Sequence, residues 1–232
     1  YPYRRLVEEN RARGRDAPEL ELIDTGAFDG NRYFDVFVEY AKADADDLLI
    51  RITAANRGPE AAVLHLLPQL WFRNTWSWGR EGEGYWRKPR LSRESEGVFR
   101  ADHESLGSFR LVAGLGPFGR GPQMLFTENE TNARRLFQAD NPSPFVKDAF
   151  HELVVSGRSL AVNPARVGTK AAAHYRIEIP AGDQVTVRLR LFDIAHAPAA
   201  ALSDEFDAIV ERRQREADAF YAQRLPESAS EE

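Results

Sequence analysis

The chain has 232 residues, 43% of them hydrophobic, which is enough to bury the core of one large domain. It contains no cysteine, which excludes disulfides and thiolate metal sites and makes a reducing, cytoplasmic location the expectation. The net charge of -5 argues against a nucleic-acid partner, and the absence of any run of about 20 apolar residues argues against a membrane span.

The first third of the chain predicts a short helix followed by strands. Residues 2–14 are amphipathic, with proline near the start and glycine at the end, which is typical of a short helix. Apolar residues then recur at every second position, the period of a strand with one buried face. Strands are therefore expected at 33–40, 48–54 and 62–72, and Pro68 favours an edge position or a bulge in the third.

The rest of the chain predicts further strands, a partly helical excursion and a closing helix. The excursion, residues 131–169, has mixed periodicity with helical turns expected near 134–138 and 145–155, and such long segments often carry function. Helical spacing returns from Ser203 to about Arg224. Further strands are expected at 98–101, 109–115, 123–127, 175–179 and 185–191. Many short strands separated by glycine and proline favour a mainly β sandwich.

Common catalytic signatures have little support. The glycines from 114 to 119 have the spacing of a dinucleotide loop, but Pro117 and Pro122 prevent the helix that such a site needs. The five histidines lack the spacing of a helical zinc site, and no nucleophile elbow or Walker loop is present, so neither a cofactor nor a metal is expected. Three carboxylate pairs are interpreted as solvated surface charge: Asp102 with Glu104, Glu128 with Glu130, and Asp148 with Glu152.

An aromatic cluster leaves the third expected strand and enters a glycine-rich polar loop. If Trp76 and Trp78 share one face of an extended segment, they offer two stacking surfaces, with Arg73 and Lys88 supplying donors. Such a surface suits a sugar ring or a domain interface, and a purely structural role is the alternative. The candidate contact residues are Trp71, Arg73, Trp76, Trp78, Trp86 and Lys88.

A second polar cluster is expected around the excursion, where two of the chain's few lysines lie next to histidines. This pattern indicates a further contact surface, and a solvated loop explains it equally well. The candidates are Lys147, Asp148, His151, Lys170 and His174.

Several blocks, spread over nearly the whole chain, carry a family resemblance. They are YPY at 1–3 together with LVEENR at 6–11, DTG at 24–26, RYFDV at 32–36, LWFRNTW at 70–76, VKDAFH at 146–151 and GTKAAAHY at 168–175. Together they resemble large glycosidases related to glycoside hydrolase family 63, of the mannosylglycerate-hydrolase-like and processing α-glucosidase-like kinds. The resemblance implies an N-terminal super-β-sandwich of antiparallel sheets, followed by an (α/α)6 barrel that hydrolyses α-glycosides with inversion. The acid and base would lie in the barrel, so no catalytic residue is assigned to this chain.

We therefore expect a non-catalytic accessory domain. Residues 1–201 would form the sandwich with a peripheral helix at 2–14, and residues 202–232 a linker helix and polar tail leading to a missing (α/α)6 catalytic domain. The start at Tyr1 rather than Met also favours a piece of a longer polypeptide. The expected partners are that domain and an α-linked oligosaccharide or glycoside, with no activity from the chain alone. The alternatives are a free-standing carbohydrate-binding module that uses the Trp-rich loop, and a structural or oligomerisation domain without sugar contact.

Overall fold

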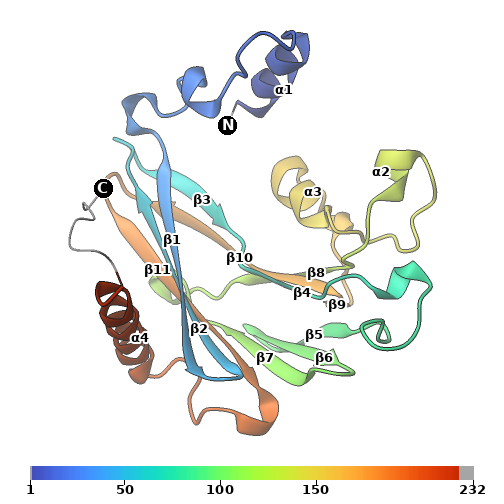
Figure 1. The fold of residues 1–232 in the computed structure, drawn as a ribbon, viewed down its shortest axis with the longest axis vertical. Coiled ribbons are helices and arrows are strands. Elements are labelled where there is room, and N and C mark those ends of the chain that lie inside the picture. The colour runs from blue at the N-terminus through green and yellow to red at the C-terminus, as the bar shows by residue number, and fades with distance from the viewer. Residues whose placement is uncertain (1, 225–232) are drawn as a thin grey trace.

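Two antiparallel β-sheets pack against each other, and helices lie on their outer sides (Figure 1). The computed structural model describes residues 2–224, so the predicted polar tail at 226–232 lies outside the described residues. The prediction of a mainly β fold with a short N-terminal helix and a C-terminal helix is confirmed. Within residues 2–224, none of the helices combines the length and the hydropathy that crossing a bilayer requires.

The larger sheet has seven strands in the order β1-β2-β11-β7-β6-β5-β9. Each pair of neighbours is antiparallel, and β1 and β2 form a long hairpin. The strands β5 and β9 were not expected, because β5 has a single buried side chain, Leu91, and β9 is only two residues long. The bounds are β1 Phe34–Asp44, β2 Asp47–Asn56, β5 Arg90–Ser95, β6 Val98–His103, β7 Gly107–Ala113, β9 Val167–Gly168 and β11 Gln184–Asp193.

The smaller sheet has four strands and is organised around β10, Lys170–Ile179. One partner of β10 is β8, Gln123–Thr127, and the others are the two pieces of the expected third strand, β3, Ala62–Leu66, and β4, Gln69–Trp71. Between the two pieces the backbone N–H of Ala173 still donates to the carbonyl of Pro68, at 3.0 Å. Pro68 thus interrupts the strand at the edge of the sheet, and β3 and β4 pair with β10 in the same register. The sequence predicted either an edge position or a bulge for Pro68, and the edge position is observed.

The main core lies between the two sheets. Alternate residues of β10, from Ala171 to Ile179, point inward, as their period of two predicts. Phe99 from the large sheet and Phe126 from the small sheet are fully buried and meet with their ring centroids 5.5 Å apart. The other fully buried large apolar side chains of this cluster are Leu91, Ile179, Val187 and Leu189.

Two helices pack on the outer faces of the sheets. The C-terminal helix α4, Glu205–Ala222, places Phe206 and Val210 against Ala41 and Leu49 of the β1–β2 hairpin. The predicted closing helix is therefore confirmed, and its first half is part of a second core.

On the other side of the molecule, α3, Ala149–Ser156, buries Ala149 and Phe150 against Leu125 and Ala172 of the small sheet. The short α2, Ala133–Phe137, lies beside it, so the helical excursion predicted after residue 131 is observed.

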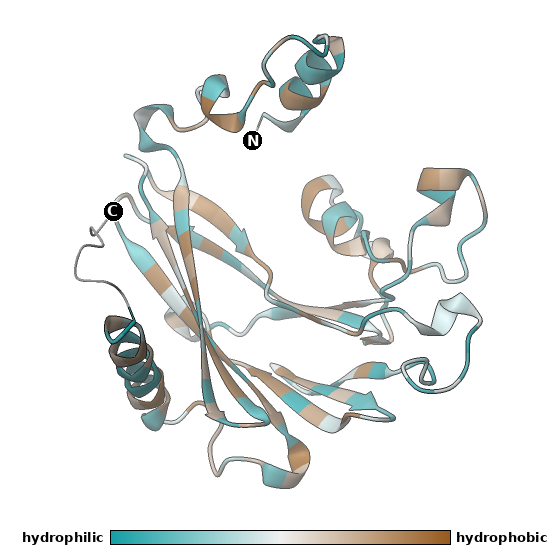
Figure 2. Cartoon of the chain, viewed as in Figure 1, coloured by the Kyte–Doolittle hydropathy of each residue, from teal (hydrophilic) through white to brown (hydrophobic). Residues whose placement is uncertain are grey.

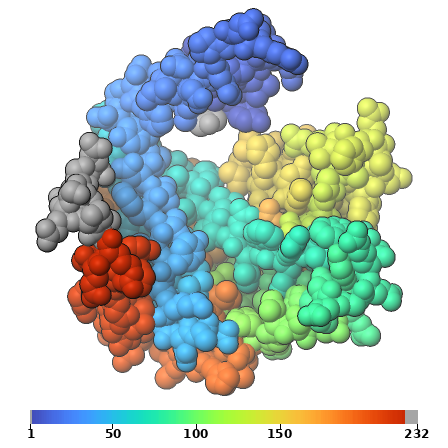
Figure 3. Space-filling view, in the orientation of Figure 1, coloured from blue at the N-terminus to red at the C-terminus, as the bar shows by residue number. Residues whose placement is uncertain are grey.

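The N-terminal segment carries α1, Tyr3–Ala12, and arches over the outer side of the small sheet. The space-filling view shows an open hollow between this segment and α3 (Figure 3). The Asn10 side chain accepts a hydrogen bond from the N–H of Leu20 at 2.7 Å and donates one to the Leu20 carbonyl at 3.0 Å. These two bonds tie α1 to the chain that follows it. The 3-10 turns of the chain are η1 Leu22–Thr25, η2 Asp29–Asn31, η3 Trp76–Trp78, η4 Pro117–Gly119, η5 Ser159–Ala161 and η6 Ile194–His196.

Candidate functional site

The aromatic loop, residues 72–89, joins β4 to β5 and is folded rather than extended. Trp76 to Trp78 form the 3-10 turn η3, which Gly79 closes with a φ of 63°. The Asn74 side chain accepts hydrogen bonds from the N–H and the hydroxyl of Ser77, at 3.2 and 2.8 Å. In a turn of three residues, positions two apart point in different directions, so the expectation that Trp76 and Trp78 share one face is wrong.

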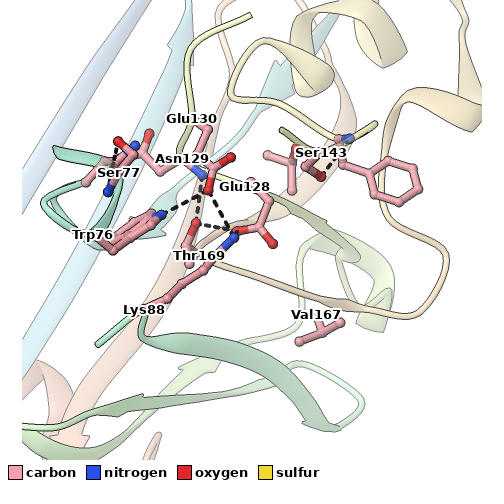
Figure 4. Close-up of polar contacts among 12 residues, drawn as sticks. Trp76, Ser77, Lys88, Glu128, Asn129, Glu130, Ser143, Val167 and Thr169 are labelled. Carbon is pink, nitrogen blue, oxygen red and sulfur yellow. Dashed lines mark hydrogen bonds and ion pairs between the residues drawn. The ribbon is translucent and has the colours of Figure 1, made fainter. Parts of the chain in front are cut away.

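Trp76 is held by a buried carboxylate. Its indole N–H donates to Oε1 of Glu130 at 2.9 Å, and the Lys88 ammonium lies 5.9 Å from its ring centroid. The Lys88 Nζ is 3.0 Å from Glu130 and 3.2 Å from Glu128, so one ammonium bridges two carboxylates (Figure 4). Lys88 was expected to offer free donors to a ligand, but these ion pairs already engage it.

The carboxylate pair is anchored to the end of β8. Glu128 accepts from the Thr169 hydroxyl at 2.7 Å, and that hydroxyl accepts from the N–H of Asn129 at 2.8 Å. Glu130 is only 6% exposed, so the interpretation of Glu128 and Glu130 as solvated surface charge is wrong. The signal that could have found them is their spacing, because two acids two residues apart directly after a buried strand continue one face of that strand.

The surroundings of Lys88 favour its charged form. Burial lowers the pKa of Lys88, but the hydrogen bond to Glu130 and the charge of Glu128 outweigh it, and the pKa is raised overall. Both carboxylates contact the same ammonium, so the arrangement ties the aromatic loop to the end of β8.

Three aromatic rings of the loop, those of Trp76, Trp78 and Tyr85, each have a cation over the ring. The Arg73 guanidinium lies 5.6 Å from the centroid of Trp78, where it was expected to serve as a ligand donor. Arg80 lies 5.5 Å from the ring of Tyr85 and donates to its hydroxyl at 2.8 Å. Trp71 is separate from these contacts, since it lies on β4 opposite Lys170 and is 54% exposed.

Trp86 has different surroundings. It is half-buried and lines a pocket of about 920 Å³ between the aromatic loop and the turn after β6. Glu104, from that turn, also lines the pocket and accepts from the N–H of Arg87 at 3.3 Å.

The second predicted cluster is only partly assembled. Lys170 donates to the carbonyl of Lys147 at 2.9 Å and lies 5.2 Å from the ring centroid of Phe150. Burial, and then the charge of Lys147, lower the pKa of Lys170. Asp148 contacts Asn132 at 3.1 Å and Arg135 at 3.2 Å, while His151 is exposed on α3.

His174 lies apart from these residues and forms a pair that the sequence did not reveal. Four positions along β10 separate it from Lys170, a distance of about 13 Å. Its Nε2 is 2.9 Å from Nδ1 of His65 on β3, and the two rings are stacked with centroids 5.1 Å apart. Burial, and then the charge of His65, lower the pKa of His174. Within residues 2–224 no three His, Asp or Glu side chains gather so as to hold a metal ion.

Comparison with known proteins gives one informative similarity. No protein-family model matches the chain. The chain is 37% identical, over 268 aligned residues, to a Saccharomyces cerevisiae protein described as "Uncharacterized protein YMR196W". The match covers 100% of this chain but 24% of the yeast protein, so the chain spans about a quarter of the length of that relative.

Proposed function

We propose that this chain is a non-catalytic accessory domain of a larger inverting α-glycosidase. In this proposal the outer side of the small sheet, together with α1, α2 and α3, docks on another domain of the same polypeptide. The acid and the base that cleave the glycoside belong to that other domain.

The observation that carries the docking surface is the exposure of α1. This helix is amphipathic, yet none of its residues is buried, and Tyr3 and Val7 are left uncovered. A helix of ten residues is only marginally stable in water by itself, and most helices gain their stability by packing an apolar face. An apolar surface that covers α1 in a longer protein would supply that packing.

Other apolar side chains are exposed on the same side of the molecule. Leu136 and Phe137 lie on α2, and Leu160 lies on η5 just after α3, at 90% exposure. Figure 2 shows hydrophobic residues on α1, α2 and α3, which border the hollow, and those of α1 and α2 are not buried. Exposed apolar side chains gathered on one side of a molecule are typical of an interaction site.

Two further facts support a domain partner. The similar yeast protein is about four times as long as the match, so it has room for other domains. The resemblance of six sequence blocks to family 63 glycosidases, described above, suggests an (α/α)6 barrel as the neighbour and an α-linked sugar as its substrate.

The docking part is tested by amide hydrogen exchange of α1. We expect fast exchange for residues 3–12 in the isolated chain and strong protection of the aligned helix in the full-length yeast relative. Equally fast exchange in both proteins contradicts docking. A stable dimer of the isolated chain with α1 protected would instead favour an oligomerisation domain.

The glycosidase part needs a separate assay. The full-length yeast relative is expected to hydrolyse α-glucosides with inversion at the anomeric carbon, and the isolated chain is expected to release no sugar. Turnover by the isolated chain would contradict the assignment of catalysis to another domain. Failure of the full-length protein on α-linked glucosides and mannosides would contradict the glycosidase, while the exchange result would still decide docking.

A further inference from the structure

We infer that the pocket beside the aromatic loop binds a neutral saccharide, with one pyranose ring on the face of Trp86. The pocket has a volume of about 920 Å³, which lies within the range of about 300–1,000 Å³ found for small-molecule sites. This site belongs to the chain itself, so the inference does not depend on which domain the chain docks against.

The ring contacts single out Trp86 among the tryptophans of the loop. Lys88 lies over the ring of Trp76, and Arg73 lies over the ring of Trp78, which also contacts Tyr85 at 6.1 Å between centroids. Within the described residues, no ring or cation is stacked on Trp86, although its side chain lines the pocket. Its face is therefore available to the apolar C–H face of a sugar.

The pocket wall carries charges of both signs. The cations are Arg80, Arg87 and Lys88, and the carboxylates are Glu81, Glu83 and Glu104. Lys88 is already paired with Glu128 and Glu130, so the wall has a small excess of negative charge, which disfavours a phosphate or another anion. It does offer both donors and acceptors, and a sugar hydroxyl uses both at once.

The wall of the pocket is fixed from behind by the network at the end of β8. Glu130 holds Trp76 at 2.9 Å and Lys88 at 3.0 Å, and these two residues flank the segment that carries Trp86. Gly82 and Gly84, with φ of 102° and 83°, supply the tight backbone between them. A segment anchored at both ends loses less conformational freedom on binding, which favours a site that exists before the ligand arrives.

The test is titration of the chain with maltotriose, α-1,2-mannobiose, cellotriose and adenosine, followed by tryptophan fluorescence and calorimetry. We expect saturable binding of at least one saccharide at millimolar or lower concentration, and none of adenosine. Trp86→Ala is expected to weaken binding by about tenfold or more, because it removes the stacking face. Trp78→Ala is the matched control and is expected to change affinity by less than about twofold, since Trp78 does not line the pocket and Arg73 lies over its ring.

Trp86→Phe tests the role of Trp86 if the alanine variant does not fold. It retains a flat ring and is expected to keep measurable binding, with an unfolding transition like that of the wild type. Absence of binding by every saccharide overturns the inference, as does tighter binding of adenosine, which would indicate a nucleoside site. An equal loss in the Trp78 and Trp86 variants overturns the assignment to Trp86. None of these readouts involves α1, so failure here leaves the docking proposal to its own test.

Discussion

At the scale of single residues, Lys88 decides how the aromatic loop is held. Its ammonium lies within 3.2 Å of two carboxylates, one of which is almost completely buried. An isolated carboxylate in that position would be costly, because burial disfavours charge without a partner. The hydrogen bonds that Glu130 accepts from Trp76 and Lys88 therefore hold the loop against the end of β8.

Replacement of Glu130 tests this role. Glu130→Ala leaves the Trp76 indole N–H without its acceptor and Lys88 with one carboxylate, so we expect the free energy of unfolding to fall by about 1–3 kcal/mol. Urea unfolding followed by tryptophan fluorescence measures it. Glu83→Ala, on the exposed part of the same loop, is the control and should stay within about 0.5 kcal/mol of the wild type. Equal losses in the two variants would show that the network does not stabilise the loop.

The stacked histidines predict a pH dependence of stability. Burial and the neighbouring His65 lower the pKa of His174 below its value of about 6.5 in an unfolded chain. The unfolded state then binds more protons as the pH falls below that value, so the free energy of unfolding should decrease from pH 7 towards pH 5. The carboxylates Glu39, Glu94 and Asp102, whose pKa values are lowered by Arg51, Arg110 and Arg100, lose their stabilisation only at more acid pH.

The measurement is the free energy of unfolding at pH 7.5 and at pH 5.5. His174→Gln removes the titrating group and is expected to show a smaller decrease between the two values than the wild type. His151→Gln is the control, since His151 is exposed on α3. A decrease of the same size in the wild type and in His174→Gln would rule out the pair as its source.

At the scale of elements, the passage from β9 to β10 is the tightest point of the fold. The chain leaves the large sheet at Gly168 and enters the small sheet at Lys170, with Thr169 between them. A Cβ on Gly168 would lie 2.1 Å from the backbone oxygen of Thr127 in β8. Backbone cannot retreat as a flexible side chain can, so this position requires glycine.

Gly168→Ala is therefore expected to lower the free energy of unfolding by at least about 1–3 kcal/mol, the usual cost of forcing atoms into filled space. Gly121→Ala is the matched control, because the nearest atom to its added Cβ is a Leu115 methyl at 3.8 Å. Thermal and urea unfolding of both variants give the comparison. A Gly168 variant as stable as the Gly121 variant would mean that the two sheets can separate here without loss.

At the scale of the whole molecule, the two terminal helices have opposite relations to the core. Phe206 of α4 is 1% exposed and belongs to a core cluster with Leu49, whereas α1 buries none of its residues. The free energy of unfolding should therefore depend on the C-terminal helix and hardly at all on the N-terminal segment.

Deletion of residues 2–31 is expected to change the free energy of unfolding by less than about 1 kcal/mol, since none of these residues belongs to the three core clusters. Phe206→Ala is expected to cost about 3–5 kcal/mol, because it opens a cavity between α4 and the β1–β2 hairpin. Urea unfolding of both variants provides the measurement. A large loss on deleting the N-terminal segment would contradict the proposal that its partner lies outside this chain.

Local pattern was sufficient for the strands and helices with one buried face. The β1–β2 hairpin, β11 and α4 were predicted close to their observed bounds, because the period of their apolar residues reports burial directly. The strand β10 was predicted only from Tyr175, because its first half carries alanines buried at consecutive positions, from Ala171 to Ala173. The strand β5 was missed because only Leu91 in it is buried.

The amino-acid sequence alone thus determined the fold class, the main strands and which loop is rich in aromatic residues. Only the tertiary structure decided what that loop does with them, because Lys88 and Trp76 meet Glu130 across 42 and 54 residues of chain. The same holds for His65 and His174, which are 109 residues apart. Periodicity reports the face on which a side chain lies, whereas a contact between distant segments depends on sheet order and on where the chain crosses between sheets.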